Sequence, residues 1–179
     1  MSWLSDYRAD VARYTTYTKH SGAQNMLAQQ ALWALLQYRL ASAVYRSSLT
    51  PAVRLPLLIV LYAWRKVVEI TTGISLPHAA VIGPGLYIPH FGPVIFNKRT
   101  QMGAHCDVHQ GVTIGFSDRR GKAGVPVIGD RVWIGPNTTL AGPITVGDHV
   151  MVSANSLVVD DIPPETVVRG VPAEVIGSR

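Results

Sequence analysis

The chain has 179 residues, of which 47 % are hydrophobic and 15 % charged, and its formal net charge is +5. This length suits one domain with a modest helical extension, and so few charges favour an oligomer, because apolar surface exposed in one chain packs against other copies. The positive charge is compatible with nucleic acid, an anionic membrane or an anionic small ligand. No basic stripe with groove-reading side chains accompanies it, so we expect no nucleic-acid partner.

The first residues, up to Asp10, carry acids and lack the basic and apolar order of a secretory signal. Cys106 is the only cysteine, so no intrachain disulfide forms and no oxidising compartment is needed. It lies two residues before Val108, where small residues pack, and is interpreted as buried and inert. We therefore expect a cytoplasmic protein.

Helical periodicity marks the first part of the chain. Leu4, Tyr7, Val11 and Tyr14 recur at helical spacing, and a broader apolar stripe follows them. The stripe consists of Ala28, Ala31, Leu32, Leu35, Leu36 and Leu40. These two patterns predict two helices.

A third helix is predicted to start at Pro51, with Thr50 as its cap, to be interrupted or bent at Pro56, and to run to about Ile70. Its segment Leu55 to Trp64 is apolar but far shorter than the roughly twenty residues that cross a bilayer. Two partners remain open for this segment, another subunit or a membrane surface, and we favour the subunit. In the second case the protein is expected at the inner face of the membrane.

The periodicity changes near Thr72 and Gly73, where a helix stop signal precedes a remainder rich in glycine, proline and valine. We expect a helical region over 1–73 and a second region over 74–179. In the second region aliphatic residues or methionine recur every six positions. They form three runs: Ile82, Ile88 and Val94; Met102, Val108 and Ile114; and Ile128, Ile134, Leu140, Val146, Val152 and Val158.

A repeat of six residues cannot bury its own apolar side chain, so successive repeats are expected to wind into a solenoid with these residues inward. Three repeats close one triangular coil, and the twelve positions predict about four coils. Glycine directly follows several inward residues, at tight corners that favour a residue without Cβ. These are Gly83, Gly103, Gly115, Gly129, Gly135 and Gly147. An insertion at 116–127 is expected to protrude as a solvated loop.

The segments Val81-Ile-Gly-Pro-Gly-Leu, Val112-Thr-Ile-Gly and Val132-Trp-Ile-Gly-Pro-Asn resemble the hexapeptide-repeat acyltransferases. That resemblance implies a left-handed parallel β-helix, a hand that spacing alone does not predict. The helical N-terminus, Ile88-Pro-His-Phe-Gly-Pro-Val, His109-Gln-Gly-Val-Thr-Ile-Gly and Arg169-Gly-Val-Pro-Ala look like the serine acetyltransferase family. The likeness covers nearly the whole chain and is closest in kind to its sugar and polysaccharide O-acetyltransferases.

Three departures from the family pattern bear on the acceptor. Pro89 stands where the family usually has the Asp of an Asp-His pair, and the entry to the first coil begins with Ser75 where an Asp is usual. The loop before Ile128 reads Gly124-Val125 in place of an Arg-His pair. We therefore favour a glycan hydroxyl as the acceptor, with L-serine as the alternative.

The resemblance implies that His90 is the catalytic base and that acetyl-CoA is the acetyl donor. An alcohol is a poor nucleophile until its proton is removed, and an imidazole with a pKa near 6.5 suits that task. Stacked coils also predict a ladder along one edge, formed by His90, Gln110, Pro136 and Ala154, two residues beyond the middle inward positions. Along such an edge the family binds the donor, between subunits.

Further candidate site residues are predicted on or near this edge. Gln110 and His109 are candidate acceptor-binding residues, and Pro136 and Ala154 leave room for acetyl-CoA. Phe116, Lys122 and Arg169 are further candidates for the donor, since basic groups suit the CoA phosphates. The family analogy implies a homotrimer, with the helices joining trimers into larger assemblies.

Other interpretations stay open. His90 could be an ordinary corner residue, and the chain a catalytically silent trimeric scaffold. His105 and His109 are four apart, as zinc ligands on a helix are, and some left-handed β-helices are zinc enzymes; on a coil, however, this spacing does not share a face. We expect no metal.

Overall fold

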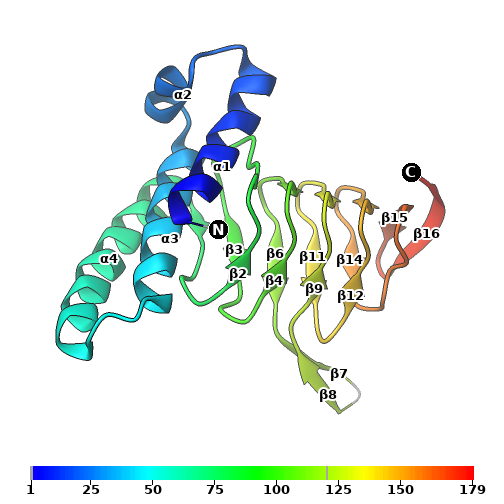
Figure 1. Cartoon of the computed structure of the whole chain (residues 1–179). Helices are drawn as coiled ribbons and strands as arrows, with labels where there is room; N and C mark the ends of the chain where they lie inside the picture. Colours follow the sequence, from blue (N-terminus) through cyan, green and yellow to red (C-terminus); the bar gives the residue numbers. More distant parts are fainter. Residues whose placement is uncertain (1, 120) are drawn as a thin grey trace.

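The computed structural model describes residues 2–119 and 121–179. Within these residues the chain forms helices at its N-terminal end and then a solenoid of short, mostly parallel strands (Figure 1). The helices are α1 (Trp3–Thr18), α2 (Gly22–Ala28), α3 (Gln30–Arg46) and α4 (Pro51–Thr72). They lie beside the first coils, and the chain ends at the opposite end of the solenoid (Figure 1).

The stripe that predicted one helix from Ala28 onward belongs to two, because the backbone is extended at Gln29, with φ −99° and ψ 104°. A capping box starts α2 separately. The hydroxyl of Ser21 accepts the backbone N–H of Gln24, and the side chain of Gln24 accepts the backbone N–H of Ser21. This Ser-x-x-Gln signal was present in the sequence and was missed.

Helix α4 runs without a break through Pro56, so the predicted interruption is wrong. Pro56 lies close to the start of the helix, where its missing N–H removes a single hydrogen bond. Thr50 occupies the cap position, as predicted, and Gly73 ends the helix in the left-handed conformation with φ 75°. No helix among the described residues is long and apolar enough to cross a membrane.

Three parallel sheets form the faces of the solenoid. The first contains β1 (Ile74–Ser75), β3 (Val94–Phe96), β6 (Thr113–Gly115), β11 (Thr139–Ala141) and β14 (Leu157–Val158). The second contains β5 (Asp107–Val108), β10 (Trp133–Ile134), β13 (Met151–Val152), β15 (Thr166–Gly170) and the antiparallel β16 (Ala173–Ser178). The third contains β2 (Val81–Ile82), β4 (Gln101–Met102), β9 (Val127–Ile128) and β12 (Thr145–Val146).

All twelve positions predicted to point inward are buried, but the predicted register is wrong at Val94. Phe96, not Val94, pairs with Ile114, so the two extra residues of the first coil lie between Ile88 and Phe96, in the turn that contains His90. The solenoid extends beyond them at both ends. Ile74 pairs with Val94 before the first predicted coil, and Val168 pairs with Val152 after the last. These flanking residues escaped the repeat search because the spacing changes at each end of the series.

Most of the glycines that follow inward residues are required because neighbouring coils approach them closely, and not because they form tight corners as predicted. A Cβ added to Gly83 would lie 2.5 Å from the carbonyl carbon of Gly103, in the next coil. Most of the others meet the neighbouring coil's backbone in the same way, but Gly115 has 3.9 Å of room. The left-handed corner positions are held by other residues, among them the glycines Gly85 and Gly111 and the non-glycine residues His105, Arg131 and Asn137.

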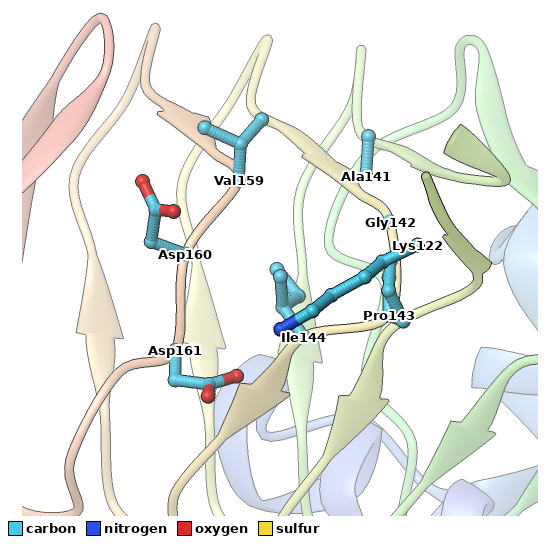
Figure 2. A pocket seen from close by; sticks show the side chains of 8 residues that line it. All are labelled: Lys122, Ala141, Gly142, Pro143, Ile144, Val159, Asp160 and Asp161. Atoms are coloured by element: carbon cyan, nitrogen blue, oxygen red, sulfur yellow. The ribbon is translucent and has the colours of Figure 1, made fainter. Parts of the chain in front are cut away.

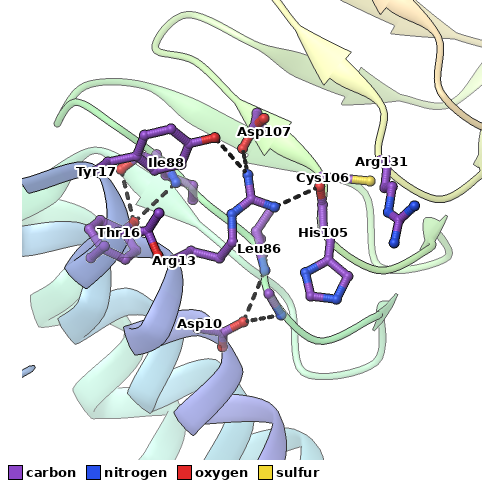
Figure 3. Close-up of polar contacts among 12 residues, drawn as sticks. Asp10, Arg13, Thr16, Tyr17, Leu86, Ile88, His105, Cys106, Asp107 and Arg131 are labelled. Carbon is purple, nitrogen blue, oxygen red and sulfur yellow. Dashed lines mark hydrogen bonds and ion pairs between the residues drawn. The ribbon is translucent and has the colours of Figure 1, made fainter.

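A buried ion pair between Asp10 and Arg39 joins the helices to the first coil. Figure 3 shows the contact of Asp10 with the backbone at Leu86. Asp10 of α1 accepts two hydrogen bonds from Arg39 of α3, at 2.9 and 3.0 Å, and two more from the backbone N–H groups of Gly85 and Leu86. Arg39 also donates to the carbonyl of Ile82. Burial raises the pKa of Asp10, and these hydrogen bonds oppose that shift.

The insertion at 116–127 forms the hairpin of β7 (Ser117–Arg119) and β8 (Lys122–Gly124), which projects from one corner of the solenoid (Figure 1). Arg120, within this insertion, lies outside the described residues.

Candidate active site

The predicted ladder of His90, Gln110, Pro136 and Ala154 lies along one corner of the solenoid. The inward residues that precede them are stacked, because β5 pairs with β10 and β10 pairs with β13. The turns follow the same stacking, since the N–H of Asn137 donates to the carbonyl of Gln110 and that of Asn155 to the carbonyl of Pro136. Gln110, Pro136 and Ala154 therefore lie along one edge in successive coils. His90 lies in the turn of the preceding coil at the same corner, since Tyr87 bridges Asp107, but Gly92 and not His90 is stacked on Gln110.

His90 is exposed at the start of this edge. Its position is set from α1, because the hydroxyl of Tyr14 donates to the carbonyl of Ile88 at 2.9 Å and accepts its N–H at 3.0 Å. No described residue hydrogen-bonds to the His90 imidazole within this chain. The ring is thus presented on a fixed backbone with both nitrogens available to a ligand or a neighbouring subunit.

A hollow of about 390 Å³ lies beside His90. Ile88, Pro89, His90 and Phe91 line one side, and the junction of α2 and α3, at 28–31, lines the other. Gln29 and Gln30 of that junction were missed by the sequence analysis, because their approach to His90 depends on how the helices pack on the solenoid. His90 is the only ionisable residue in this lining.

A hydrogen bond defines which ring nitrogen of His109 carries the proton. Its Nδ1 is 3.0 Å from the carbonyl oxygen of Ile134, and since that oxygen only accepts, Nδ1 carries the proton. The ring also packs against Trp133, with centroids 4.6 Å apart. Burial lowers the pKa of His109, and positive charge on His90 lowers it further. A neutral His109 therefore offers Nε2 as an acceptor.

Gln110 has an unused hydrogen-bond acceptor at the same edge. Its Oε1 is buried and has no partner among the described residues. The side chain lies beside the turn after His90, since a Cβ added to Gly92 would be 3.3 Å from the Cβ of Gln110. Buried polar atoms are nearly always paired, so this oxygen is suited to a donor supplied by a ligand or water.

The predicted donor-binding residues divide between two corners. Pro136 and Ala154 share the edge of His90, and Arg169 follows Val168, which pairs with Val152 at the far end of the same face. Phe116 is exposed beneath the guanidinium of Arg99, 5.2 Å from the ring centroid, at the base of the hairpin.

Lys122 lies away from this edge. It lines a hollow of about 180 Å³ together with Ile144, Asp160 and Asp161 (Figure 2). The two carboxylates lie on the side toward which the lysine extends (Figure 2). Within one chain this arrangement is poorly suited to phosphate, because the anion would meet Asp160 and Asp161 as well as the lysine.

The structure also places Cys106 and the two histidines considered as zinc ligands. Cys106 is buried, and desolvation raises the pKa of its thiol to about 12, which fits an inert side chain. His105 and His109 lie at different parts of the coil, His105 at a left-handed corner and His109 beside Ile134. Within 2–119 and 121–179 no group of three His, Cys, Asp or Glu side chains could hold a metal ion.

Comparison with known proteins adds evidence to this geometry. Residues 126–160 match the family model described as bacterial transferase hexapeptide (six repeats). A serine acetyltransferase from Helicobacter pylori (strain J99) is 31 % identical over 151 residues, which cover 84 % of each chain. The chain belongs to the serine acetyltransferase family. The predicted fold class, a left-handed parallel β-helix with an N-terminal helical region, and the predicted family of acyltransferases are thereby confirmed.

Two further similar proteins show how much of the chain the similarity covers. Serine acetyltransferase from Mycobacterium tuberculosis is 39 % identical over 109 residues, or 61 % of this chain, and the match spans about half of that relative, 48 %. The structure of soybean serine acetyltransferase complexed with serine has a TM-score of 0.84 and 28 % identity, and covers 98 % of this chain and 70 % of that one.

Proposed function

We propose that this protein transfers the acetyl group of acetyl-CoA to a hydroxyl group, with His90 as the general base. The observation that carries the proposal is the shared corner: an exposed imidazole on a fixed backbone, followed along the edge by the small residues Pro136 and Ala154. Membership of an acyltransferase family supports the same reaction. Acetyl-CoA fits along this edge as the donor, because no long side chain extends from 136 or 154.

His90 removes the proton of the acceptor hydroxyl as its oxygen attacks the thioester carbonyl. The carbonyl oxygen becomes a tetrahedral oxyanion, which a backbone N–H stabilises. When the intermediate collapses, the carbon–sulfur bond breaks, and the CoA thiolate leaves and takes up the proton held by His90. The products are the acetyl ester and CoA, with no covalent enzyme intermediate.

His109 and Gln110 are proposed to hold the acceptor beside His90. The neutral His109 presents Nε2 and Gln110 presents Oε1, so both offer lone pairs to hydroxyl or ammonium donors. Two acceptors near the base position the nucleophile without competing for its transferred proton, because the pKa of His109 is lowered. Arg169, at the far end of the same face, is proposed to contact the CoA phosphates.

L-serine is the acceptor best supported by the relatives, which are named serine acetyltransferases. A neutral sugar hydroxyl remains the second candidate on one specific observation. Serine carries a carboxylate and an ammonium group, whereas the hollow beside His90 contains no ionisable residue apart from His90 itself. A neighbouring subunit would have to supply the charged contacts for serine, while a sugar needs none.

The proposed assembly is a homotrimer, in which the donor binds between adjacent solenoids. The low charged fraction of the chain supports an oligomer, and family analogy supports three copies. A cytoplasmic location is proposed with it, since acetyl-CoA is a cytoplasmic metabolite.

The deciding measurement is release of the CoA thiol from acetyl-CoA, with L-serine compared against a panel of sugars and oligosaccharides, for the wild type and His90→Ala. Turnover that falls at least about 100-fold in the mutant supports His90 as the base. The acceptor that sustains turnover identifies the substrate class. His20→Ala is a matched control, because His20 is an exposed histidine outside the hollow. Unchanged turnover in His90→Ala removes His90 from the mechanism, and no turnover with any acceptor favours the scaffold.

A further inference from the structure

One face of α4 is apolar and uncovered. The opposite face packs on α3, where the side-chain amide of Gln37 donates to the carbonyl of Leu61, and it contributes the buried residues Val68 and Thr72. α4 lies at the outer side of the helical region, away from the solenoid (Figure 1). Its exposed large hydrophobic residues are Val53, Leu55, Leu57, Ile59, Val60, Tyr62, Val67 and Ile70, which are 41 to 84 % exposed. A contiguous patch of this kind is typical of a binding surface.

The net charge of the chain is concentrated in the same region. Residues 1–73 contain eight Lys or Arg and three Asp or Glu, whereas residues 74–179 contain eight of each. The whole formal charge of +5 therefore belongs to the helical region, and the solenoid is neutral. The basic residues of the helical region are scattered along the sequence, so no basic run marks this uneven distribution of charge.

Two of the three acidic residues of the helical region are paired with its own cations, and the third, Asp6, is half-buried. Asp10 is fully buried against Arg39, and Glu69, the only acid of α4, is held by Arg65 and Lys66 at 2.7 Å each. Two cations, in contrast, lie beside the apolar residues of α4. Arg46 of α3 and Arg54 of α4 line one hollow together with Leu55 and Leu58.

We propose that the exposed face of α4 binds the surface of an anionic lipid bilayer. Its aliphatic side chains enter the boundary between headgroups and acyl chains while the helix lies in the plane of the surface, and the surrounding cations attract the anionic headgroups. A second copy of the chain is a poorer occupant, because face-to-face contact would bring two regions of charge +5 together. The helix docks on the bilayer and does not cross it.

The test is flotation of the full-length protein with vesicles of phosphatidylcholine alone and of phosphatidylcholine with phosphatidylglycerol. Wild-type protein is expected to float with the anionic vesicles, and less so at high salt, because screening weakens the headgroup attraction. Ile59→Asp with Val60→Asp is expected to lower the bound fraction about tenfold or more, since two apolar side chains leave the contact. The matched control is Val175→Asp with Ile176→Asp, which adds the same charge to the exposed β16.

The outcomes separate this proposal from its alternatives. Absence of binding to anionic vesicles overturns it, as does equal loss of binding in both double variants. If the wild type fails to bind and Ile59→Asp with Val60→Asp lowers the assembly mass in solution, a second copy covers the face instead. Circular dichroism and CoA thiol release check that each variant folds. Vesicle binding is measured without substrate, so its result is independent of the proposed acetyl transfer.

Discussion

The hydroxyl of Tyr14 satisfies both main-chain groups of Ile88, two residues before the proposed base His90. We predict that Tyr14→Phe lowers the free energy of unfolding by about 1–3 kcal/mol, because a buried N–H and a buried carbonyl lose their partner. Turnover is expected to fall as well, since the backbone that presents His90 loosens. Urea unfolding and CoA thiol release measure the two effects.

Tyr17→Phe is the control for this prediction. Tyr17 is 56 % exposed and, among the described residues, its hydroxyl hydrogen-bonds only to Arg13 of α1, so its loss should change the unfolding free energy by less than about 0.5 kcal/mol. Equal effects of the two substitutions would contradict the role given to Tyr14.

The ion pair of Asp10 and Arg39 yields a second prediction. Asp10→Asn leaves the buried guanidinium of Arg39 without a compensating charge, and we expect a loss of about 3–5 kcal/mol in unfolding free energy. Lys66→Gln removes a cation from a more exposed pair with Glu69 and should cost less than about 1 kcal/mol. A similar, small loss in both variants would show that the buried pair contributes little.

The lowered pKa of His109 predicts how stability depends on pH. In the unfolded chain His109 takes up a proton near its ordinary pKa of 6.5, whereas in the folded protein it does so only at lower pH. Unfolding therefore binds a proton in that interval, and the contribution of His109 to stability, complete above about pH 6.5, is lost as the pH falls.

Chemical unfolding at a series of pH values from 7.5 to roughly 5 checks this sign. His109→Gln should lessen the loss of stability on acidification, because the substituted side chain does not titrate. An identical slope in the variant would mean that other groups carry the pH dependence.

The close approach of the coils predicts a large loss of stability at one glycine and almost none at another with a similar sequence context. Gly83→Ala places a Cβ 2.5 Å from the backbone of Gly103, and since backbone cannot rotate aside, we expect a loss of about 1–3 kcal/mol. Gly115→Ala meets nothing closer than 3.9 Å and should change stability by less than about 0.5 kcal/mol. Thermal unfolding of the two variants distinguishes coil-to-coil contact from a general requirement for glycine.

Sequence periodicity predicted the solenoid and its inward residues because each hexad is local, and the position of Ile88 in the register placed His90 at the same corner as Gln110. Contacts between distant segments gave no such signal. Tyr14 and Ile88 are 74 residues apart, and Lys122 and Asp161 line one hollow only because the hairpin folds beside a later coil. Asp10 and Arg39, charged residues within apolar stripes, were the one available hint of a buried pair.

The strand β16 runs antiparallel to β15 at the last coil, and the helices lie at the first. A solenoid of stacked parallel strands is a template at each end, on which another chain could continue the hydrogen-bond ladder. Reversal of the chain at β16 replaces that template with a strand of opposite direction and six residues, Ala173–Ser178. β16 thus covers the outer edge of β15 in one of the three sheets, and at that edge a strand of another chain would meet an antiparallel partner and not the parallel ladder of the solenoid.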